Sequence, residues 1–282
     1  MSYRIGIDVG GTKVLGVALN DGKVVRKKQF SVSNKSKERF FTELLEVAHY
    51  LAGGRKYSSI EIGICLPGFV KNGVLKKAPN LQFMVGFDFA KEFSRKGFKK
   101  ASAENDGKCF ALGEAVRLKK KNLVGLTLGT GIGCGIIIDG KIYRGKGSSG
   151  ELSHTIIQPN GRKCSCGNLG CLEEYFSKRA VLRESKKVFG KEIDPVAINE
   201  MCRKGNKNAI QVCKNLGFYL GIGLANISNI IDPEVISISG GLSKNKLLVK
   251  FGQQEMRRWL YSSEPKIAFG KYESAAIGAA SL

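Results

Sequence analysis

A chain of 282 residues can form one large domain or two of ordinary size, and it can bury a core without disulfide bonds. Hydrophobic residues make up 43% and charged residues 25% of the chain, which excludes wholesale disorder. The 46 Lys and Arg residues exceed the 24 Asp and Glu residues by 22, and this excess would favour contact with phosphates, nucleic acid or acidic membrane surfaces.

The first third of the chain alternates in the manner of strands and then turns helical. Strands are predicted from Tyr3, from Lys13 to Leu19 and from Lys23 to Val32, with Asp21-Gly22 as a two-residue hairpin turn. Apolar residues then recur at helical spacing from Phe40 to Ala48. A buried strand follows at residues 60–66, and a helix at 107–121. The order of three antiparallel strands, a helix and a strand predicts an α/β fold.

A repeat links this opening to the middle of the chain. The segment from Val124 resembles the segment from Ile5 in the same register, with Gly125 and Gly129 at the positions of Gly6 and Gly10. Two Gly-rich hairpins that arose independently are the alternative. We interpret the repeat as two related halves that close about a cleft. The predicted domains are residues 1–117 and 118–271, and a C-terminal helix over about 272–282 can pack back on the first.

The second half is predicted to be mainly helical. Helices are expected over residues 179–189, 195–204 and 206–231, followed by a strand at 235–239 and a helix through Trp259. The start of the chain lacks the apolar segment and cleavage site of a signal peptide, and no uncharged apolar stretch reaches the roughly 18 residues of a membrane span. Five cysteines lie within apolar runs, which is typical of buried thiols in a reducing compartment. We therefore expect a cytoplasmic protein. These cysteines are Cys65, Cys109, Cys134, Cys202 and Cys213.

Two glycine-rich turns could bind phosphate. The first, Gly10-Gly11-Thr12-Lys13, follows a strand that ends near Asp8, a carboxylate that could hold Mg²⁺. The second, Gly129-Thr130-Gly131 and onward to Gly135, belongs to the other half. Neither is a dinucleotide fingerprint or a P-loop, and glycines are common in hairpins. Together, facing one another, they would fit a nucleoside triphosphate tail.

A third glycine turn, Gly240-Gly241, stands between a strand and a helix. It could let the backbone approach a flat ligand and point a helix N-terminus at it. A plain tight turn is the alternative.

Glu104-Asn105-Asp106 lies between a predicted strand and the helix that follows it. These polar side chains could simply cap the helix, and Asp106 is well placed for that. Ligands bind at strand ends of open α/β sheets, so a carboxylate here could instead accept a proton from an attacking hydroxyl.

His154, Cys164, Cys166 and Cys171 form the strongest purely chemical pattern. Three thiols and one imidazole make a closed tetrahedral zinc set, which is typical of a structural ion. The Cys-x-Cys spacing departs from the usual Cys-x-x-Cys. The alternatives are a disulfide with a spare thiol, or cysteines without a ligand.

These residues together resemble the ROK family, the bacterial-type sugar kinases and related repressors of the actin-like ATPase fold. The resemblance runs nearly end to end. Its motifs are Asp8-Val-Gly-Gly-Thr-Lys13, Ala103-Glu-Asn-Asp106 with Ala111-Leu-Gly-Glu114, Gly129-Thr-Gly-Ile-Gly133, Gly150-Glu151-x-x-His154, the cysteine loop ending at Glu173, and Ser239-Gly-Gly241.

The resemblance implies roles for named residues. Asp106 would be the catalytic base, and His154 would serve both zinc and the sugar. The other sugar contacts would be Asn105, Glu151 and Glu173, with Gly68 and Asn80 nearby. The first two glycine loops would hold ATP phosphates with Mg²⁺, and Gly240-Gly241 would face the adenosine. A homodimer through the larger half is implied as well.

The chain departs from the family pattern at Ser153, where a Gly is usual before the His. The repressor branch carries an N-terminal winged-helix domain, and a first strand at Tyr3 leaves no space for one, which favours a kinase without a DNA-binding domain.

We therefore expect an ATP-dependent kinase acting on the 6-hydroxyl of a hexose, with glucose as first choice. The alternatives are a kinase of N-acetylglucosamine or N-acetylmannosamine and, more distantly, a non-catalytic sugar sensor or nucleic-acid-binding protein. The basic residues form scattered pairs and one triplet, which is more typical of a solvated surface than of a nucleic-acid site.

Overall fold

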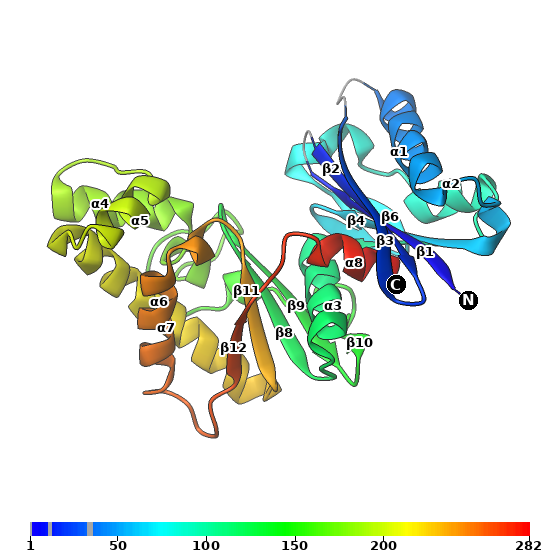
Figure 1. Cartoon of the computed structure of the whole chain (residues 1–282). Coiled ribbons are helices and arrows are strands. Elements are labelled where there is room, and N and C mark those ends of the chain that lie inside the picture. The colour runs from blue at the N-terminus through cyan, green and yellow to red at the C-terminus, as the bar shows by residue number, and fades with distance from the viewer. Residues whose placement is uncertain (1, 11–12, 33–35) are drawn as a thin grey trace. The chain divides into compact units, whose positions relative to one another are not determined.

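The computed structural model describes residues 2–10, 13–32 and 36–282, so the predicted site residues Gly11 and Thr12 lie outside the described residues. The chain divides into two compact units (Figure 1). Unit 1 comprises Met1–Lys121, Gly135–Ser149 and Lys271–Leu282, and unit 2 comprises Asn122–Cys134 and Gly150–Gly270.

Unit 1 is built on a five-stranded sheet in the order β3-β2-β1-β4-β7. Neighbours among the first three strands pair antiparallel, as the sequence predicted, and β4 and β7 join the sheet in parallel. A short hairpin, β5-β6, was not predicted. The strands are β1 (Tyr3–Val9), β2 (Lys13–Asn20), β3 (Lys23–Ser31), β4 (Ile60–Leu66), β5 (Phe69–Lys71), β6 (Val74–Lys77) and β7 (Lys100–Asn105).

Local chemistry explains where the first elements begin and end. Asp21 and Gly22 both have positive φ, 47° and 79°, as the predicted two-residue hairpin turn requires. The Ser36 side chain caps the next helix by accepting from the Arg39 N–H, and Gly53 ends it in the left-handed conformation. The helices of unit 1 are α1 (Lys37–Ala52), α2 (Phe89–Arg95), α3 (Asp106–Leu118) and α8 (Ser274–Ala280).

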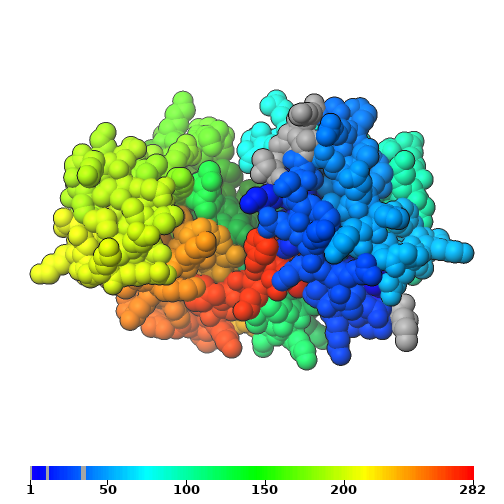
Figure 2. Space-filling view, turned by 45° about the horizontal axis from the view of Figure 1, so that its top comes forward, coloured from blue at the N-terminus to red at the C-terminus, as the bar shows by residue number. Residues whose placement is uncertain are grey.

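The C-terminal helix α8 packs against β1, β4 and α3. In the space-filling view, C-terminal residues in red lie against N-terminal residues in blue (Figure 2). The backbones touch: a Cβ on Gly6 would lie 1.9 Å from the Ala276 carbonyl oxygen, and one on Gly113 would lie 1.8 Å from that of Ser274. Only glycine allows this approach, so these two positions fix how α8 lies on unit 1.

The second sheet has the order β10-β9-β8-β11-β12, in which β8, β11 and β12 run parallel. Most predicted helices match to within a residue, but the last ends at Met256, not at Trp259. The strands are β8 (Leu123–Leu128), β9 (Ile132–Ile138), β10 (Lys141–Ile142), β11 (Val235–Ser239) and β12 (Lys266–Phe269). The helices are α4 (Lys178–Phe189), α5 (Pro195–Arg203), α6 (Lys207–Ile231) and α7 (Lys246–Met256).

Within the described residues, no helix combines the length and apolar character needed to cross a membrane.

Candidate active site and metal cluster

The turn from β7 into α3 holds Asp106 in a hydrogen-bonded frame. Asn105 Oδ1 accepts from the Lys108 N–H at 3.2 Å, so Asn105 caps α3. Capping by Asp106, one of the two roles that the sequence left open, is not what the structure shows, because the helix begins one residue earlier than predicted and Asn105 precedes it as the cap. Asp106 Oδ1 accepts instead from the Asn105 side-chain amide and the Gly107 N–H, both at 2.8 Å.

The surroundings of Asp106 shift the pKa of its carboxyl group. By surface area its side chain is exposed, but many protein atoms surround it. Their desolvating effect raises the pKa of Asp106 to about 6, the negative charge of Asp8 adds to this, and the two hydrogen bonds partly oppose it. A carboxylate that titrates near neutral pH is suited to act as a general base.

Asp8 lies near the end of β1 and is held by a neighbouring thiol. Cys65 pairs with it in register across β1 and β4, and its Sγ donates to Asp8 Oδ1 at 3.1 Å. Burial raises the pKa of Asp8, and the thiol hydrogen bond opposes that rise. The adjoining turn is closed by the Gly10 N–H donating to the Lys13 carbonyl at 2.9 Å, and Lys13 is exposed.

The two weaker sugar candidates of unit 1 differ. Gly68 has φ 119°, and a Cβ there would lie 2.1 Å from the Lys77 carbonyl oxygen. Its own carbonyl accepts from Asn105 Nδ2 at 2.9 Å, so Gly68 and Asn105 are brought together. Asn80 lies exposed on a 3₁₀ turn, Pro79–Met84, and within the described residues no hydrogen bond joins it to Asn105 or Asp106.

In unit 2, the Glu173 side chain contacts the second glycine loop. The loop is closed by the Gly129 N–H donating to the Gly131 carbonyl at 2.9 Å, with Thr130 exposed at its tip. Glu173 Oε2 accepts from the Ile132 N–H at 3.4 Å, and a Cβ on Gly131 would lie 2.2 Å from the same oxygen. The structure thus joins a predicted sugar contact to a predicted phosphate loop, a contact across 41 residues that sequence patterns did not indicate.

Arginines hold the segment that carries Glu173. Glu174, which is buried, accepts from Arg179 at 2.8 Å and from Arg183 at 2.9 Å. Arg179 also lies 3.8 Å from Glu173. Sequence reasoning missed this group, although two arginines one helical turn apart, at i and i+4, were a usable sign of it.

His154, Cys164, Cys166 and Cys171 do converge. Their ligand atoms all lie within 4.8 Å of one another, with Cys164 Sγ 3.7 Å from His154 Nδ1 and Cys166 Sγ 3.6 Å from Cys171 Sγ. Tetrahedral zinc with its usual Zn–S and Zn–N lengths places ligand atoms about 3.5–3.8 Å apart. The donor set and its spacing therefore fit zinc, and Nδ1 is the nitrogen that His154 turns to the cluster.

Backbone turns bring the cysteines together and lead to the acidic residues. The Cys164 N–H donates to the Asn168 carbonyl at 2.8 Å, and Gly170 has φ 83° where a Cβ would lie 1.8 Å from the Gln158 carbonyl oxygen. Cys171 then precedes the 3₁₀ turn that contains Glu173. Glu151 is exposed and precedes the 3₁₀ turn of His154, whose N–H donates to the Glu151 carbonyl at 3.0 Å.

The third glycine turn differs from expectation. Gly240 has φ 94°, and a 3₁₀ turn, Leu242–Lys244, follows before α7 begins. The 3₁₀ turn starts directly after Gly241, but the α-helix does not, because Asn245 caps α7 four residues further on. A small pocket of about 120 Å³ adjoins this turn. Its mostly apolar lining includes Val181, Pro195, Val196, Cys213, Gly241 and Leu242.

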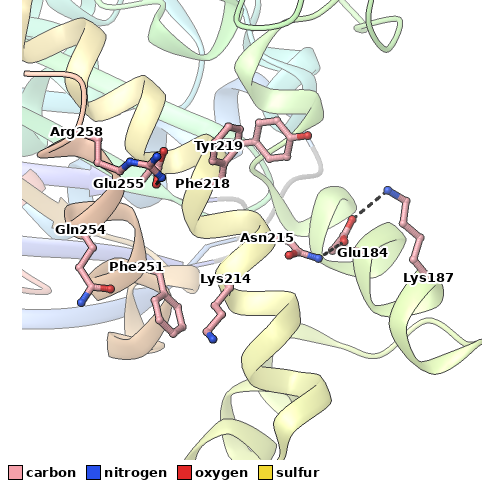
Figure 3. A pocket seen from close by; sticks show the side chains of 10 residues that line it. All are labelled: Glu184, Lys187, Lys214, Asn215, Phe218, Tyr219, Phe251, Gln254, Glu255 and Arg258. Atoms are coloured by element: carbon pink, nitrogen blue, oxygen red, sulfur yellow. Dashed lines mark hydrogen bonds and ion pairs between the residues drawn. The ribbon is translucent and has the colours of Figure 1, made fainter.

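A larger hollow of about 640 Å³ in unit 2 lies among α4, α6 and α7 (Figure 3). Glu184 and Asn215 point toward one another there and hydrogen-bond at 2.7 Å, and Lys187 pairs with Glu184 at 3.2 Å. It contains none of the residues predicted to act in binding or catalysis, so size alone does not mark the functional site.

Comparison with known proteins identifies the family. A protein-family sequence model described as "ROK family" matches residues 4–282 of the chain. This chain belongs to the ROK family. Its fold is accordingly the actin-like ATPase fold, as the sequence motifs predicted.

Curated ROK relatives include both regulators and kinases. A xylose repressor of Bacillus spizizenii is 34% identical over 88% of the chain, and the chain spans 66% of that protein's length. A glucokinase of Thermotoga maritima is 30% identical, covering 85% of this chain and 82% of that one. An N-acetyl-D-glucosamine kinase of Mannheimia succiniciproducens is 30% identical, covering 98% of both.

A solved ROK structure shows the same fold. The ROK family glucokinase of Streptomyces griseus, described in complex with glucose and AMPPNP, is 26% identical with a TM-score of 0.78. It covers 100% of this chain and 99% of its own. The chain is thus similar along its whole length to a sugar kinase that binds a nucleotide analogue.

Proposed function

We propose that this ROK protein is an ATP- and Mg²⁺-dependent kinase that transfers the γ-phosphoryl group to the 6-hydroxyl of a hexose, with glucose as the preferred hexose. The single observation that carries the proposal is the placement of Asp106 directly after β7, with its Oδ1 held by the Asn105 amide and the Gly107 N–H. Desolvation there raises the pKa of Asp106 to about 6, which supports the assignment. Carboxyl groups with raised pKa values are enriched at active sites.

Asp106 would accept the proton of the attacking hydroxyl. The Asn105 amide and the Gly107 N–H hold Oδ1, which leaves Oδ2 to receive that proton. Positioned general bases contribute about 10²–10⁴-fold to rates.

The remaining hydroxyls of the sugar would be bound by side chains named from the family motif. These are Asn105, Glu151, His154 and Glu173, with Gly68 and Asn80 as further contacts. Because His154 Nδ1 faces the cysteines, Nε2 is the nitrogen available to a hydroxyl. The Glu173 carboxylate, fixed by Arg179 and the Ile132 N–H, would accept hydrogen bonds from the sugar.

ATP would be held by the glycine turns. Backbone N–H groups of the Gly10–Lys13 and Gly129–Gly131 turns, other than those of Gly10 and Gly129 that close the turns, would donate to the phosphates. The pocket beside Gly240-Gly241 has an apolar lining suited to a purine. Mg²⁺ bound with the nucleotide neutralises phosphate charge. Asp8, with Oδ1 fixed by Cys65, is the residue that would hold the ion, directly or through water.

Zinc in the Cys₃His cluster would have a structural role. All four positions of the tetrahedron are protein ligands, so no position is left for a substrate. The ion would fix the loop that leads into Glu173.

The decisive experiment is turnover of Asp106→Asn across a panel of glucose, N-acetylglucosamine and N-acetylmannosamine, with ATP consumption as readout. We expect loss of at least about 10²-fold in kcat. Because folding raises the pKa of Asp106, the ionised group disfavours the folded state above pH 6. The variant should therefore melt no lower than the native chain at pH 8. Full activity with any sugar in Asp106→Asn contradicts the proposal.

Two alternatives follow from named relatives. The N-acetyl-D-glucosamine kinase favours an N-acetylhexosamine as substrate, and preference for that sugar in the panel would select it. The xylose repressor favours a sugar-responsive regulator without catalysis. Sugar binding by the native chain with no phosphoryl transfer to any sugar would select the regulator. We also propose a homodimer through the predicted second domain, residues 118–271. Light scattering would measure the mass of the assembly.

A further inference from the structure

A cavity of about 360 Å³ in unit 1 lies along β7 and has an unusual lining. It is bordered by the β5–β6 turn, the first turn of α3 and residues 144–147. Four cations and one carboxylate line it: Lys71, Lys108, Arg144, Lys146 and Glu104. All five belong to the same unit.

Lys108 is the buried cation of this cavity. The residue is 5% exposed, and its Nζ donates to the Gly147 carbonyl at 2.6 Å. An ammonium group carries three N–H donors. Over the part of the chain that the structure describes, this carbonyl is its one hydrogen-bond acceptor, and no carboxylate pairs with it. A buried charge without a counter-ion is costly, so an anion here would stabilise it.

The one carboxylate of the cavity is already engaged. Glu104 is 5% exposed; its Oε2 accepts from Arg144 Nε at 2.7 Å, and its Oε1 accepts from the Asn105 N–H at 3.0 Å. Its negative charge therefore compensates the positive charge of Arg144. The positive charges of Lys71, Lys108 and Lys146 have no compensating carboxylate in the cavity. Lys71 and Lys146 are exposed and, among the described residues, form no ion pair.

We propose that this cavity binds a phosphate dianion, free or carried by a small organic molecule. Three cations around one space suit a doubly charged, multi-oxygen anion better than a carboxylate, and Lys108 supplies two N–H donors not used by the protein. The volume exceeds that of one phosphate, which leaves room for an organic part. Because Glu104 accepts from the Asn105 N–H, the ligand would lie close to the segment of Asp106.

The test is calorimetric titration of the full chain with inorganic phosphate and, separately, with glucose 6-phosphate. AMPPNP and the best-bound sugar of the panel are present at saturation, so that phosphate held by the glycine turns or the sugar site does not contribute. We expect saturable 1:1 binding and an affinity about tenfold lower in Lys108→Met. Lys76→Met is the matched control, because Lys76 is exposed on β6 outside this cavity, and it should bind as the native chain does.

The double variant Lys71→Gln/Lys146→Gln keeps the test decisive if Lys108→Met does not fold. We expect it to weaken binding and to flatten the dependence of affinity on salt. Tighter binding of glucose 6-phosphate indicates an ester as the ligand, and equal or weaker binding indicates free phosphate. Absence of saturable binding to either, or equal losses in Lys108→Met and Lys76→Met, overturns the proposal. Binding is measured without turnover, so failure of the kinase proposal would leave this result readable.

Discussion

At the scale of single residues, the main question at the β7–α3 turn is which side chain caps the helix and which is available to accept a proton. The sequence patterns located the turn and its three polar residues, but they left open whether Asp106 caps the helix or accepts a proton. Cap identity depends on one residue of helix register, which periodicity does not resolve. Since Asn105 is the cap, Asp106 is available for chemistry.

The pH dependence of turnover follows from Asp106. In the proposed mechanism the ionised form of Asp106 is the base, and its pKa is raised to about 6, so protonation below that pH would remove activity. We expect kcat/KM to rise with pH up to about 6 and then level, and to fall about tenfold per unit below it. A profile between pH 4.5 and 8 measures this. A rate independent of pH across 5–7 would show that another group takes the proton.

Other residue-scale features could not be read from sequence. The contact of Glu173 with the Gly131 loop joins residues far apart in the chain. The cavity that surrounds the Lys108 charge forms only when β7 and residues 144–147 come together in the fold. By contrast, the candidate metal cluster of one histidine and three cysteines could be recognised in the sequence, because the three cysteines fall within eight residues, where backbone turns alone can bring them together.

At the scale of elements, long periodic segments were predicted well and short ones were missed. Strand β4 and helix α6 carry enough apolar residues to reveal their period. The hairpin β5–β6 and strand β12 have three or four residues each, too few for any period to show. The domain boundary near residue 118 stays a prediction.

The docking of α8 on α3 depends on a buried ion pair. Glu114 is fully buried, pairs with Arg117, and accepts from the Ser274 hydroxyl and the Lys271 N–H. Glu114→Gln keeps the shape of the side chain but removes the buried negative charge that pairs with Arg117. Breaking a buried pair costs about 3–5 kcal/mol, so we expect a marked fall in the denaturation midpoint.

The matched control for this change is Glu92→Gln. Glu92 pairs with Arg95 at the same spacing, i,i+3, but both side chains reach solvent. Exposed pairs of this kind contribute about 1 kcal/mol or less. Chemical denaturation of both variants gives the comparison. Equal losses in the two variants would show that burial of Glu114 does not anchor α8.

The cysteine loop provides a second prediction at this scale. We expect one zinc per chain by metal analysis and eight free thiols after denaturation with chelator. Cys171→Ser should lose the metal and lower the melting temperature, because zinc binding energy is folding energy for such a loop. Cys202→Ser, a buried thiol outside the cluster, should keep both. Six free thiols instead of eight, with no metal, would indicate a disulfide and exclude the zinc cluster.

At the scale of the whole molecule, the net charge of +22 is unevenly distributed. Unit 1 carries 28 Lys and Arg against 13 Asp and Glu, and unit 2 carries 18 against 11. Part of the excess lies on β3, an edge strand of its sheet on which Lys23, Arg26, Lys27 and Lys28 are exposed. Lysines on an edge strand discourage pairing with other chains, which gives this charge a structural use without a nucleic-acid partner.

Repulsion among these cations should lower the stability of the native chain at low ionic strength. The Debye length shortens from about 30 Å at 0.01 M salt to about 10 Å at 0.1 M, so salt screens most of the long-range repulsion. We expect the melting temperature to rise by a few degrees over this range in a chloride salt, since about 1 kcal/mol corresponds to roughly 2–4 °C in a chain of this size class. Lys23→Gln/Lys27→Gln should reduce the rise, because both charges lie on β3. A melting temperature that falls with salt in the native chain would mean that attractive ion pairs outweigh repulsion, and the excess charge would then need a bound anionic partner to explain it.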